Sequence, residues 1–272
     1  MKRKLIVSDL DGTLFNSKKE IAESDIKIIQ RLISDGHLFT VATSRHYLTL
    51  RKYLKDIYNE CPIITANGSL IYDVLNDEVI FANYMEESTI KDICKIALRN
   101  NYRTMFQAKG RLLLSSGHSF IKKYKEGDIH IRNICADVIP EEVDIDKDFD
   151  MSGIIQISFQ TEDVKGLMET FEKEINNPYI EFVNTSEGIV VCKPANTSKA
   201  TAIEFLLNYY QMDKDDLIVC GDDNNDIEMF DYAIHSIAPS NARDSIKERA
   251  EYVSLSNDEH GITYALENYY KL

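Results

Sequence analysis

Two aspartates separated by one residue follow a short apolar run near the start of the chain. Asp9 and Asp11 come after Leu5–Val7, and Gly12 follows them. A β-branched apolar run is typical of a buried parallel strand, and glycine permits a sharp exit from such a strand. Both carboxylates are therefore expected at the carboxyl end of a strand, where open α/β sheets bind ligands. An ordinary turn after a strand is the alternative, because Asp and Gly also populate turns.

A second pair of aspartates, Asp222 and Asp226, follows the apolar run 217–220 far along the chain. A parallel sheet would gather these acids and the first pair into one cleft. Clustered carboxylates are costly unless a cation compensates them, and a carboxylate and water shell suits Mg²⁺. The sequence therefore predicts a Mg²⁺ site, unless each acid ends its own strand in solvent.

Composition limits the classes of function. The chain has 272 residues, 44% of them hydrophobic, which is enough for one large domain or two modest ones. The formal net charge of −14 argues against binding to nucleic acids or anionic membranes. No apolar run has the length of a membrane span or of a signal peptide, so we expect a cytoplasmic protein. The sequence does not predict an oligomeric state. The cysteines are odd in number and lack metal spacing; they are Cys61, Cys94, Cys135, Cys192 and Cys220.

The first and last parts of the chain alternate expected strands and helices. A second buried strand, 38–42, delivers Thr43, Ser44 and Arg45 at its carboxyl end, and a third, 62–65, leads into Asn67. This βα alternation predicts an α/β core of Rossmann-like type with a parallel sheet. The expected helices are 24–34, 48–58, 199–210, 227–232 and 242–250, and the later strands are 217–220, 235–238 and 252–254.

The middle of the chain has a different texture, with expected hairpins. Seven acids lie between Asp137 and Asp150 with Lys147 as the single base, so 122–150 is expected to be a solvated loop. We therefore expect an inserted α+β domain at 84–190, and a core made of 1–83 and 191–272. Its expected helices are 86–100 and 163–175, and its expected strands are 102–106, 111–114, 154–159, 179–183 and 189–192.

The polar residues form a set of motifs that resembles the haloacid dehalogenase superfamily. Its phosphatases show Asp-x-Asp-Gly-Thr, then a Ser or Thr after a second strand, a Lys, and Gly-Asp-x-x-x-Asp. The matching positions are 9–13, Thr43, Lys199 and 221–226. The late segment 257–261, Asn-Asp-Glu-His-Gly, resembles the Cof-like subgroup, and the insertion implies a type C2 cap. Ser44 replaces a usual glycine, and Pro239-Ser240 replaces a common Met-Gly.

The resemblance implies a division of roles among the acids. Asp9 would attack phosphorus and form an aspartyl phosphate, while Asp11 would protonate the leaving group and then activate water. Mg²⁺ would be held by Asp9, Asp222 and the backbone carbonyl of Asp11. Asp226 would orient metal-bound waters or Lys199 rather than bind the ion directly.

Phosphoryl transfer spreads charge over oxygens that fixed donors should surround. The resemblance implies that Thr43, Lys199 and Asn225 supply them, with backbone amides after Asp9. Each also has an ordinary structural role, but a lysine at a helix N-terminus is disfavoured by the helix dipole unless an anion offsets it. The residues predicted to contact phosphate or substrate are Leu10, Thr43, Ser44, Arg45, Asn67, Lys199 and Asn225. Candidates in the cap are Lys109, Arg111, His118 and Lys122, unless these are merely solvated.

The sequence therefore predicts a Mg²⁺-dependent phosphatase that acts on a small phosphorylated metabolite, with sugar phosphates as the favoured class. A phosphomutase is the nearest alternative, because it would use the same aspartyl phosphate. A binding or regulatory protein without turnover is another alternative, but no predicted catalytic position is substituted.

Overall fold

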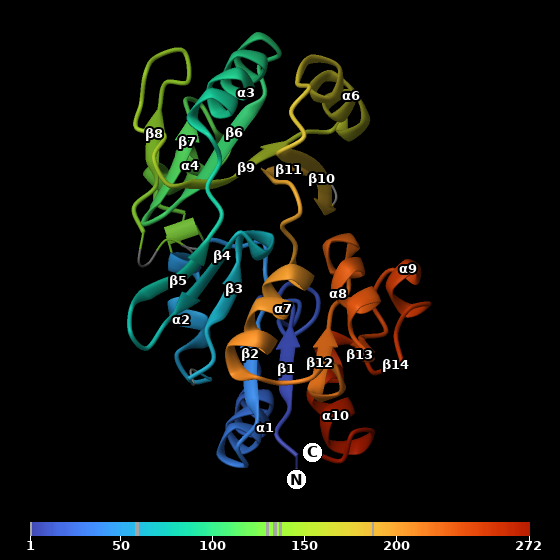
Figure 1. Ribbon diagram of the computed structural model, residues 1–272. Coiled ribbons are helices and arrows are strands. Elements are labelled where there is room, and N and C mark those ends of the chain that lie inside the picture. The colour runs from blue at the N-terminus through green and yellow to red at the C-terminus, as the bar shows by residue number, and fades with distance from the viewer. Residues whose placement is uncertain (1, 58–59, 129–130, 133–134, 136–137, 187) are drawn as a thin grey trace. The chain divides into compact units, whose positions relative to one another are not determined.

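The computed structural model describes the whole chain except residues 1, 58–59, 129–130, 133–134, 136–137 and 187. The chain divides into two compact units. The residues of each unit can be found in Figure 1 by the colour that marks residue number. The first unit is built from Met1–Ser44, Tyr53–Phe81 and Ser198–Leu272, and the second from Arg45–Lys52 and Ala82–Thr197. Segments at both ends of the chain thus form one unit, and the middle forms the other.

A five-stranded parallel sheet is the centre of the first unit, in the order β14-β13-β12-β1-β2. Strand β1 lies between β12 and β2, with Ser8 beside Cys220 on one side and Val41 on the other. The carboxyl ends of these strands therefore meet at one edge. The strands are β1 (Leu5–Ser8), β2 (Leu38–Val41), β12 (Leu217–Cys220), β13 (His235–Ala238) and β14 (Tyr252–Val253).

Alternation along the central strands sends side chains to both faces of this sheet. Leu5 and Val7 pack in one buried cluster with Ile203 and Leu206 of α7 and with Met229 of α8. Helices α1 and α10 contact each other, and they contact β2 and β13, respectively. The helices of this unit are α1 (Glu23–Ser34), α2 (Arg51–Leu54, which begins in the second unit), α7 (Lys199–Tyr210), α8 (Ile227–Tyr232), α9 (Asp244–Lys247) and α10 (Gly261–Asn268).

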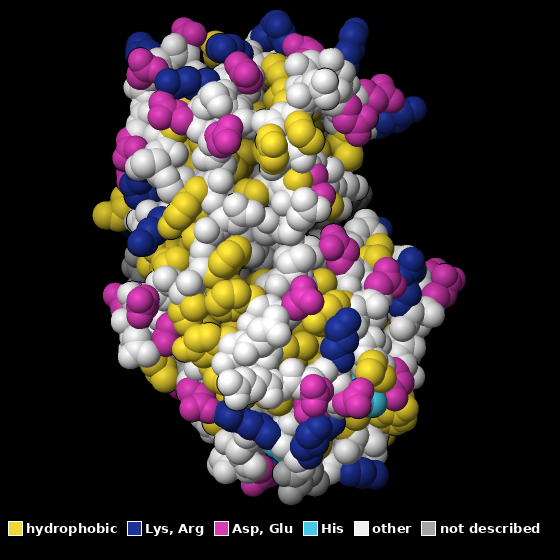
Figure 2. All heavy atoms as spheres, viewed as in Figure 1, with side chains coloured by type: hydrophobic (Ala, Val, Ile, Leu, Met, Phe, Trp, Pro, Cys, Tyr) yellow, Lys and Arg dark blue, Asp and Glu magenta, His cyan; other side chains and the backbone are white. Residues whose placement is uncertain are grey.

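A smaller sheet extends the first unit beyond β2. It has the order β3-β4-β5, and a parallel bridge between Ala42 and Ile64 joins its first strand to the end of β2. Phe81 packs against Phe205, and Phe205 packs against Tyr209, which is 57% exposed. Figure 2 shows hydrophobic side chains gathered on this face, over β5 and α7. The strands are β3 (Ile63–Thr65), β4 (Leu70–Asp73) and β5 (Glu78–Ala82).

A six-stranded sheet forms the second unit, in the order β10-β11-β9-β6-β7-β8, antiparallel except for the pair β7 and β8. Helices α3 and α6 cover one face through Ile93 and Phe171, while Ile121 of α4 belongs to a separate cluster with Leu112. The strands are β6 (Arg103–Ala108), β7 (Arg111–Ser115), β8 (Glu141–Val143), β9 (Ile154–Gln160), β10 (Ile180–Ser186) and β11 (Ile189–Pro194); the helices are α3 (Glu87–Arg99), α4 (Ser119–Glu126) and α6 (Val164–Glu174).

The predicted fold class, a parallel α/β core with an inserted α+β domain, is confirmed, and several local predictions were wrong. The expected helix 48–58 is split into a 3₁₀ turn at Tyr47–Thr49 and the short α2, and 58 lies outside the described residues. The expected helix 242–250 is reduced to α9. The expected loop 122–150 contains the end of α4 and the strand β8, and residue 137 lies outside the described part.

The unit boundaries also differ from the predicted ones. Residues 191–194 belong to β11, which pairs with β9 and β10, so the second unit continues to Thr197 rather than ending at 190. Residues 82–83 and the segment Arg45–Lys52 also cluster with the second unit. Strand pairing and side-chain packing, which sequence texture does not report, set these boundaries.

Among the described residues, none of the helices combines the length and the apolar character that crossing a membrane requires.

Candidate functional site

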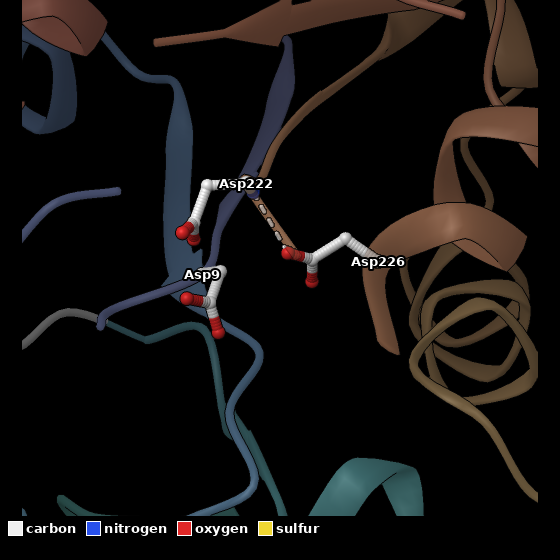
Figure 3. Close-up of side chains that lie close together, drawn as sticks. All are labelled: Asp9, Asp222 and Asp226. Carbon is white, nitrogen blue, oxygen red and sulfur yellow. Dashed lines mark hydrogen bonds between the residues drawn. The ribbon is translucent and has the colours of Figure 1, made fainter. Parts of the chain in front are cut away.

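Three buried or half-buried carboxylates meet at the carboxyl edge of the parallel sheet. Asp9 follows β1 and its amide donates to the carbonyl oxygen of Cys220, 2.8 Å away, at the end of the neighbouring β12. Asp222 and Asp226 lie in the turn after β12, and one oxygen from each of the three carboxylates lies within 4.8 Å of the others. Figure 3 shows the three side chains side by side. The structure therefore brings together three of the four aspartates that were predicted to gather at the Mg²⁺ site.

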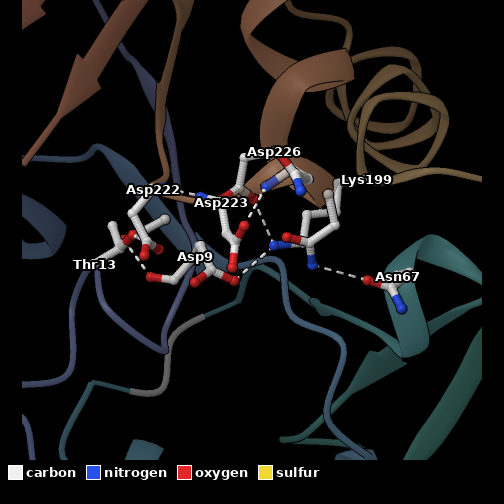
Figure 4. Close-up of polar contacts among 10 residues, drawn as sticks. Asp9, Thr13, Asn67, Lys199, Asp222, Asp223 and Asp226 are labelled. Carbon is white, nitrogen blue, oxygen red and sulfur yellow. Dashed lines mark hydrogen bonds and ion pairs between the residues drawn. The ribbon is translucent and has the colours of Figure 1, made fainter. Parts of the chain in front are cut away.

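Lys199 compensates part of this negative charge. Its ammonium lies 2.6 Å from Oδ1 of Asp9 and 2.6 Å from Oδ1 of Asp226, and Figure 4 draws both contacts. The side chain of Lys199 is fully buried. Lys199 is the first residue of α7, which Ser198 caps in a reciprocal pair of hydrogen bonds with Thr201. Burial lowers the pKa of the lysine, but the charges of Asp226 and Asp9 outweigh it and raise the pKa above its usual value. The lysine is therefore held as a cation.

Asp226 organises the turn as well as the lysine. Its second oxygen, Oδ2, accepts hydrogen bonds from the backbone amides of Asp222 and Asp223, at 2.9 and 3.0 Å. Gly221 permits this approach, because a Cβ there would lie 2.6 Å from Cγ of Asp226. Both oxygens of Asp226 thus have protein partners. This arrangement favours the predicted orienting role over direct coordination of a metal.

The electrostatics of the other two acids show the cost of this cluster. Burial raises the pKa of Asp9 well above its ordinary value, and the charges of Asp226, Asp222 and Asp11 add to the effect against the attraction of Lys199. Burial and the charge of Asp226 raise the pKa of Asp222 to about 7. A single lysine therefore leaves negative charge uncompensated, and the all-oxygen donor set fits a hard divalent cation such as Mg²⁺.

The turn after Asp11 is shaped around Asp222. Gly12 has φ +88°, and a Cβ there would lie 2.3 Å from Oδ2 of Asp222. Thr13 Oγ1 donates a 2.7 Å hydrogen bond to Oδ1 of the same carboxylate. Thr13 was not among the predicted site residues, although its motif Asp-x-Asp-Gly-Thr was. Asp11 itself contacts Nζ of Lys19 at 2.9 Å, and Lys19 was also missed because nothing in its spacing pointed to the site.

Predicted phosphate contacts lie beside this cluster. The carbonyl oxygen of the buried Thr43 accepts from the amide of Asn67 at 3.0 Å, and Asn67 Oδ1 accepts from Nδ2 of Asn225 at 3.0 Å. Asn67 adopts φ +54°, and the following Gly68 lies so close to α7 that a Cβ would be 2.1 Å from the carbonyl oxygen of Ser198. The structure thereby ties the turn after β3 to the loop after β12 and to the start of α7.

The remaining predicted contact residues lie in both units of the chain. Leu10 is buried, and its carbonyl oxygen accepts from the amide of Phe15 at 2.7 Å. Arg45 belongs to the second unit, whereas Ser44 ends a segment of the first, so their contacts with a substrate stay predictions. The four cap candidates have structural partners. Arg111 pairs with Asp150, Lys122 with Glu126, His118 accepts from the amide of Phe120, and the Lys109 amide donates to the carbonyl oxygen of Gly153.

A family model described as haloacid dehalogenase-like hydrolase matches residues 6–266, which is almost the whole chain. The chain belongs to this family. Within it the protein is a Cof-like phosphatase, in agreement with its sequence motifs. One relative of this hydrolase is the 5-amino-6-(5-phospho-D-ribitylamino)uracil phosphatase YwtE of Bacillus subtilis, 28% identical over 286 residues, with 97% of each chain covered.

Solved structures share the fold of this hydrolase. TM0651 from Thermotoga maritima has a TM-score of 0.80 and 25% identity, and the match covers 98% of this chain and 97% of the other. The subclass IIB sugar phosphatase BT4131 has a TM-score of 0.82 at 19% identity, covering 99% of this chain and 100% of the other. At that low identity the second match shows the shared fold.

Proposed function

We propose that this phosphatase hydrolyses a small phosphorylated metabolite of the sugar or polyol phosphate class, with Mg²⁺ as its cofactor and Asp9 as the nucleophile. The observation that carries the proposal is the meeting of Asp9, Asp222 and Asp226, two of which, Asp9 and Asp226, pair with a buried lysine. The substrate class is supported by the activities of one relative, a phosphatase of a phosphoribityl compound, and of one structural neighbour, a sugar phosphatase. A cytoplasmic location stays a prediction.

The nucleophile is set by position and charge. Asp9 directly follows the central strand β1, and Lys199 contacts its Oδ1 at 2.6 Å, so one carboxylate oxygen is anchored and the carboxylate is oriented. Attack of the carboxylate on phosphorus expels the alcohol and leaves an aspartyl phosphate, which water then hydrolyses. Asp9 and Asp222 would hold Mg²⁺, which would reduce the repulsion between the nucleophile and the anionic phosphate.

Asp11 is proposed to move the protons. It lies two residues after Asp9, and 33% of its side chain is exposed. The leaving-group oxygen of a bound substrate and a water molecule can therefore reach it. It would give its proton to the departing alkoxide and then accept one from the attacking water. Contact with Nζ of Lys19 at 2.9 Å holds this carboxylate in place.

Fixed donors are proposed to surround the transferring phosphoryl group. Thr43, Asn225 and Lys199 come from different elements, but the contacts through Asn67 and Gly68 keep these elements together. Preorganised donors of this kind stabilise the charge that develops on the phosphoryl oxygens. The second unit, 82–197 with 45–52, is proposed to be the cap that selects the leaving group.

The test measures phosphate release from an aryl phosphate and from a panel of sugar and polyol phosphates. We expect hydrolysis that needs Mg²⁺, stops with a chelator, and is absent in Asp9→Asn. Full activity of Asp9→Asn or of the chelated enzyme would overturn the proposed mechanism. An isomerised phosphosugar in place of free phosphate would show a phosphomutase instead.

A further inference from the structure

The loop from Gly12 to Glu20, which follows the two catalytic aspartates in the chain, is closed by its own hydrogen bonds. The amide of Phe15 donates to the carbonyl oxygen of Leu10 at 2.7 Å, and the amide of Asn16 donates to the carbonyl oxygen of Glu20 at 3.0 Å. Oδ1 of Asn16 accepts from the amides of Lys18 and Glu20, at 2.9 and 3.1 Å. The loop therefore has a defined conformation rather than an open one.

Two asparagines from distant parts of the first unit hold this loop from outside. Asn241, after β13, donates through Nδ2 to the carbonyl oxygen of Gly12 at 2.8 Å. Asn257, before α10, donates through Nδ2 to the carbonyl oxygen of Phe15 at 2.8 Å. The two are also linked, because the amide of Asn257 donates to Oδ1 of Asn241 at 2.9 Å. They act as one unit on the start of the loop.

Asp258 holds the far side of the same loop. Its Oδ1 accepts from the amide of Ser17 at 2.7 Å, and its Oδ2 accepts from Oγ of Ser17 at 2.6 Å. The 3₁₀ turn that carries it, Asn257–Glu259, is itself fixed by a reciprocal cap between Ser256 and Glu259. We call Asn241, Asn257 and Asp258 the C-terminal clamp.

The clamped loop touches two of the site's acids. Near its start, Thr13 donates to Oδ1 of Asp222, and near its end Lys19 contacts Oδ1 of Asp11. Lys19 adopts φ +60°, in the left-handed region that residues other than glycine rarely adopt. The surrounding contacts must therefore maintain this backbone conformation. The carboxylates proposed to hold the metal and to move the proton thus both depend on the loop's position.

We infer that the C-terminal clamp consists of positioning residues for catalysis: it fixes the 12–20 loop so that Thr13 and Lys19 hold Asp222 and Asp11 in place. This inference rests on the proposed function for its catalytic consequence. Among the described residues, the hydrogen bonds of the clamp do not include Thr43, Lys199 or Asn225, the residues proposed to bind phosphate. Loosening it should therefore lower kcat more than it raises KM.

The experiment uses Asn-to-Asp substitutions, which are nearly isosteric and replace a donating amide with an accepting carboxylate. Asn257→Asp and Asn241→Asp each remove one hydrogen bond to a loop carbonyl. Asn268→Asp is the matched control, because Asn268 also donates to a backbone carbonyl, that of Tyr264 at 3.0 Å. This substitution adds the same charge, at the end of α10. Asp258→Asn is a further variant on the exposed side. The measurements are kcat and KM with an aryl phosphate, amide hydrogen exchange across 13–20, and thermal unfolding.

We expect the clamp variants to lower kcat on the order of 10- to 100-fold with KM changed less than about threefold. We also expect faster exchange at the amides of Phe15 and Ser17 and a melting temperature close to that of Asn268→Asp, with the control fully active. Unchanged kcat in the folded clamp variants would overturn the inference, as would a loss of kcat that appears equally in Asn268→Asp. If an asparagine variant does not fold, Asp258→Asn decides by the same criteria. The two proposals can fail separately, because hydrogen exchange does not depend on turnover. A wild type without phosphatase activity would refute the proposed function, whereas unaltered exchange in the clamp variants would refute the clamp.

Discussion

The ammonium of Lys199 lies 2.6 Å from Oδ1 of Asp226, and neither side chain is exposed to solvent. The same ammonium lies 2.6 Å from Asp9, so one cation is shared by two buried carboxylates from different elements. Removing a charge of a buried pair leaves its partner uncompensated, which is costlier than losing the attraction alone. Lys199 therefore joins the start of α7, the turn after β12 and the end of β1 as well as facing the reaction.

Lys199→Met is expected to abolish phosphatase activity and to destabilise the metal-free protein. The substitution keeps the length of the side chain but leaves Asp9 and Asp226 without their cation, at a cost of about 3–5 kcal/mol. Urea unfolding in a chelating buffer measures this loss. Lys247→Met is the control, because the partly exposed Lys247 pairs with the exposed Asp244, and its loss should change neither stability nor activity. Equal stability of the two variants would show that the buried pairs contribute nothing.

Gly12→Ala is expected to remove activity through contact with Asp222. At φ +88° any Cβ is strained, at a cost of about 1–3 kcal/mol, and here it would also lie 2.3 Å from the carboxylate. Gly36→Ala separates the two effects, because Gly36 has φ +91° and an added Cβ would meet nothing within 4 Å. Both variants should lose stability, but Gly12→Ala alone should lose Mg²⁺-dependent hydrolysis. Comparable activity in both would contradict the role assigned to this close approach.

Asp9→Asn is expected to be inactive yet more stable than the wild type without metal. Burial and the charges of Asp226, Asp222 and Asp11 raise the pKa of Asp9 well above its ordinary value, against the attraction of Lys199. As pH rises above the ordinary pKa of an aspartate, Asp9 loses its proton in the unfolded chain before it does so in the folded protein. The free energy of unfolding therefore falls as pH rises toward the pKa that Asp9 has in the folded protein. A neutral amide removes that loss, and Lys199 keeps its buried pair with Asp226. Urea unfolding at pH 8 with a chelator checks this, with Asp244→Asn as an exposed control, and a less stable Asp9→Asn would contradict it.

Much of the fold and the site was predictable because local signals carry it. The apolar runs before Asp9 and Asp222 predicted strands of one parallel sheet, and β1 and β12 do lie in that sheet, where they pair in parallel. The expected helix 199–210 placed Lys199 at a helix N-terminus, and the conflict between a lysine and the helix dipole there predicted nearby anions, which Asp9 and Asp226 supply. These features depend on a few consecutive residues and on the geometry of parallel sheets.

Other features depend on contacts that the sequence does not report. Lys19 reaches Asp11 through a left-handed backbone conformation, and Asp258 lies about 240 residues from its partner Ser17. Strand β8 forms in an acidic segment because β7 supplies its hydrogen bonds, not because Glu141–Val143 favours a strand. Tertiary context therefore decided the elements and site residues that were missed.

His46 makes the stability of the second unit sensitive to acid. The buried imidazole bonds through Nε2 to the carbonyl oxygen of Ala108 at 2.8 Å, while Nδ1 accepts from the amide of Leu48, so the neutral ring is the form that fits. Burial lowers its pKa to about 4 despite the Ala108 carbonyl. As pH falls from 6.5 to about 4, the unfolded chain binds this proton before the folded protein does, and stability falls, by about 3 kcal/mol from this group. His118, also buried and with its pKa lowered to about 4, acts in the same direction.

Urea unfolding between pH 7 and pH 4 tests this sensitivity to acid. The free energy of unfolding should fall less steeply with pH in His46→Gln than in the wild type, and less steeply again in the double variant with His118→Gln. An unchanged pH slope in the double variant would show that neither ring is held neutral.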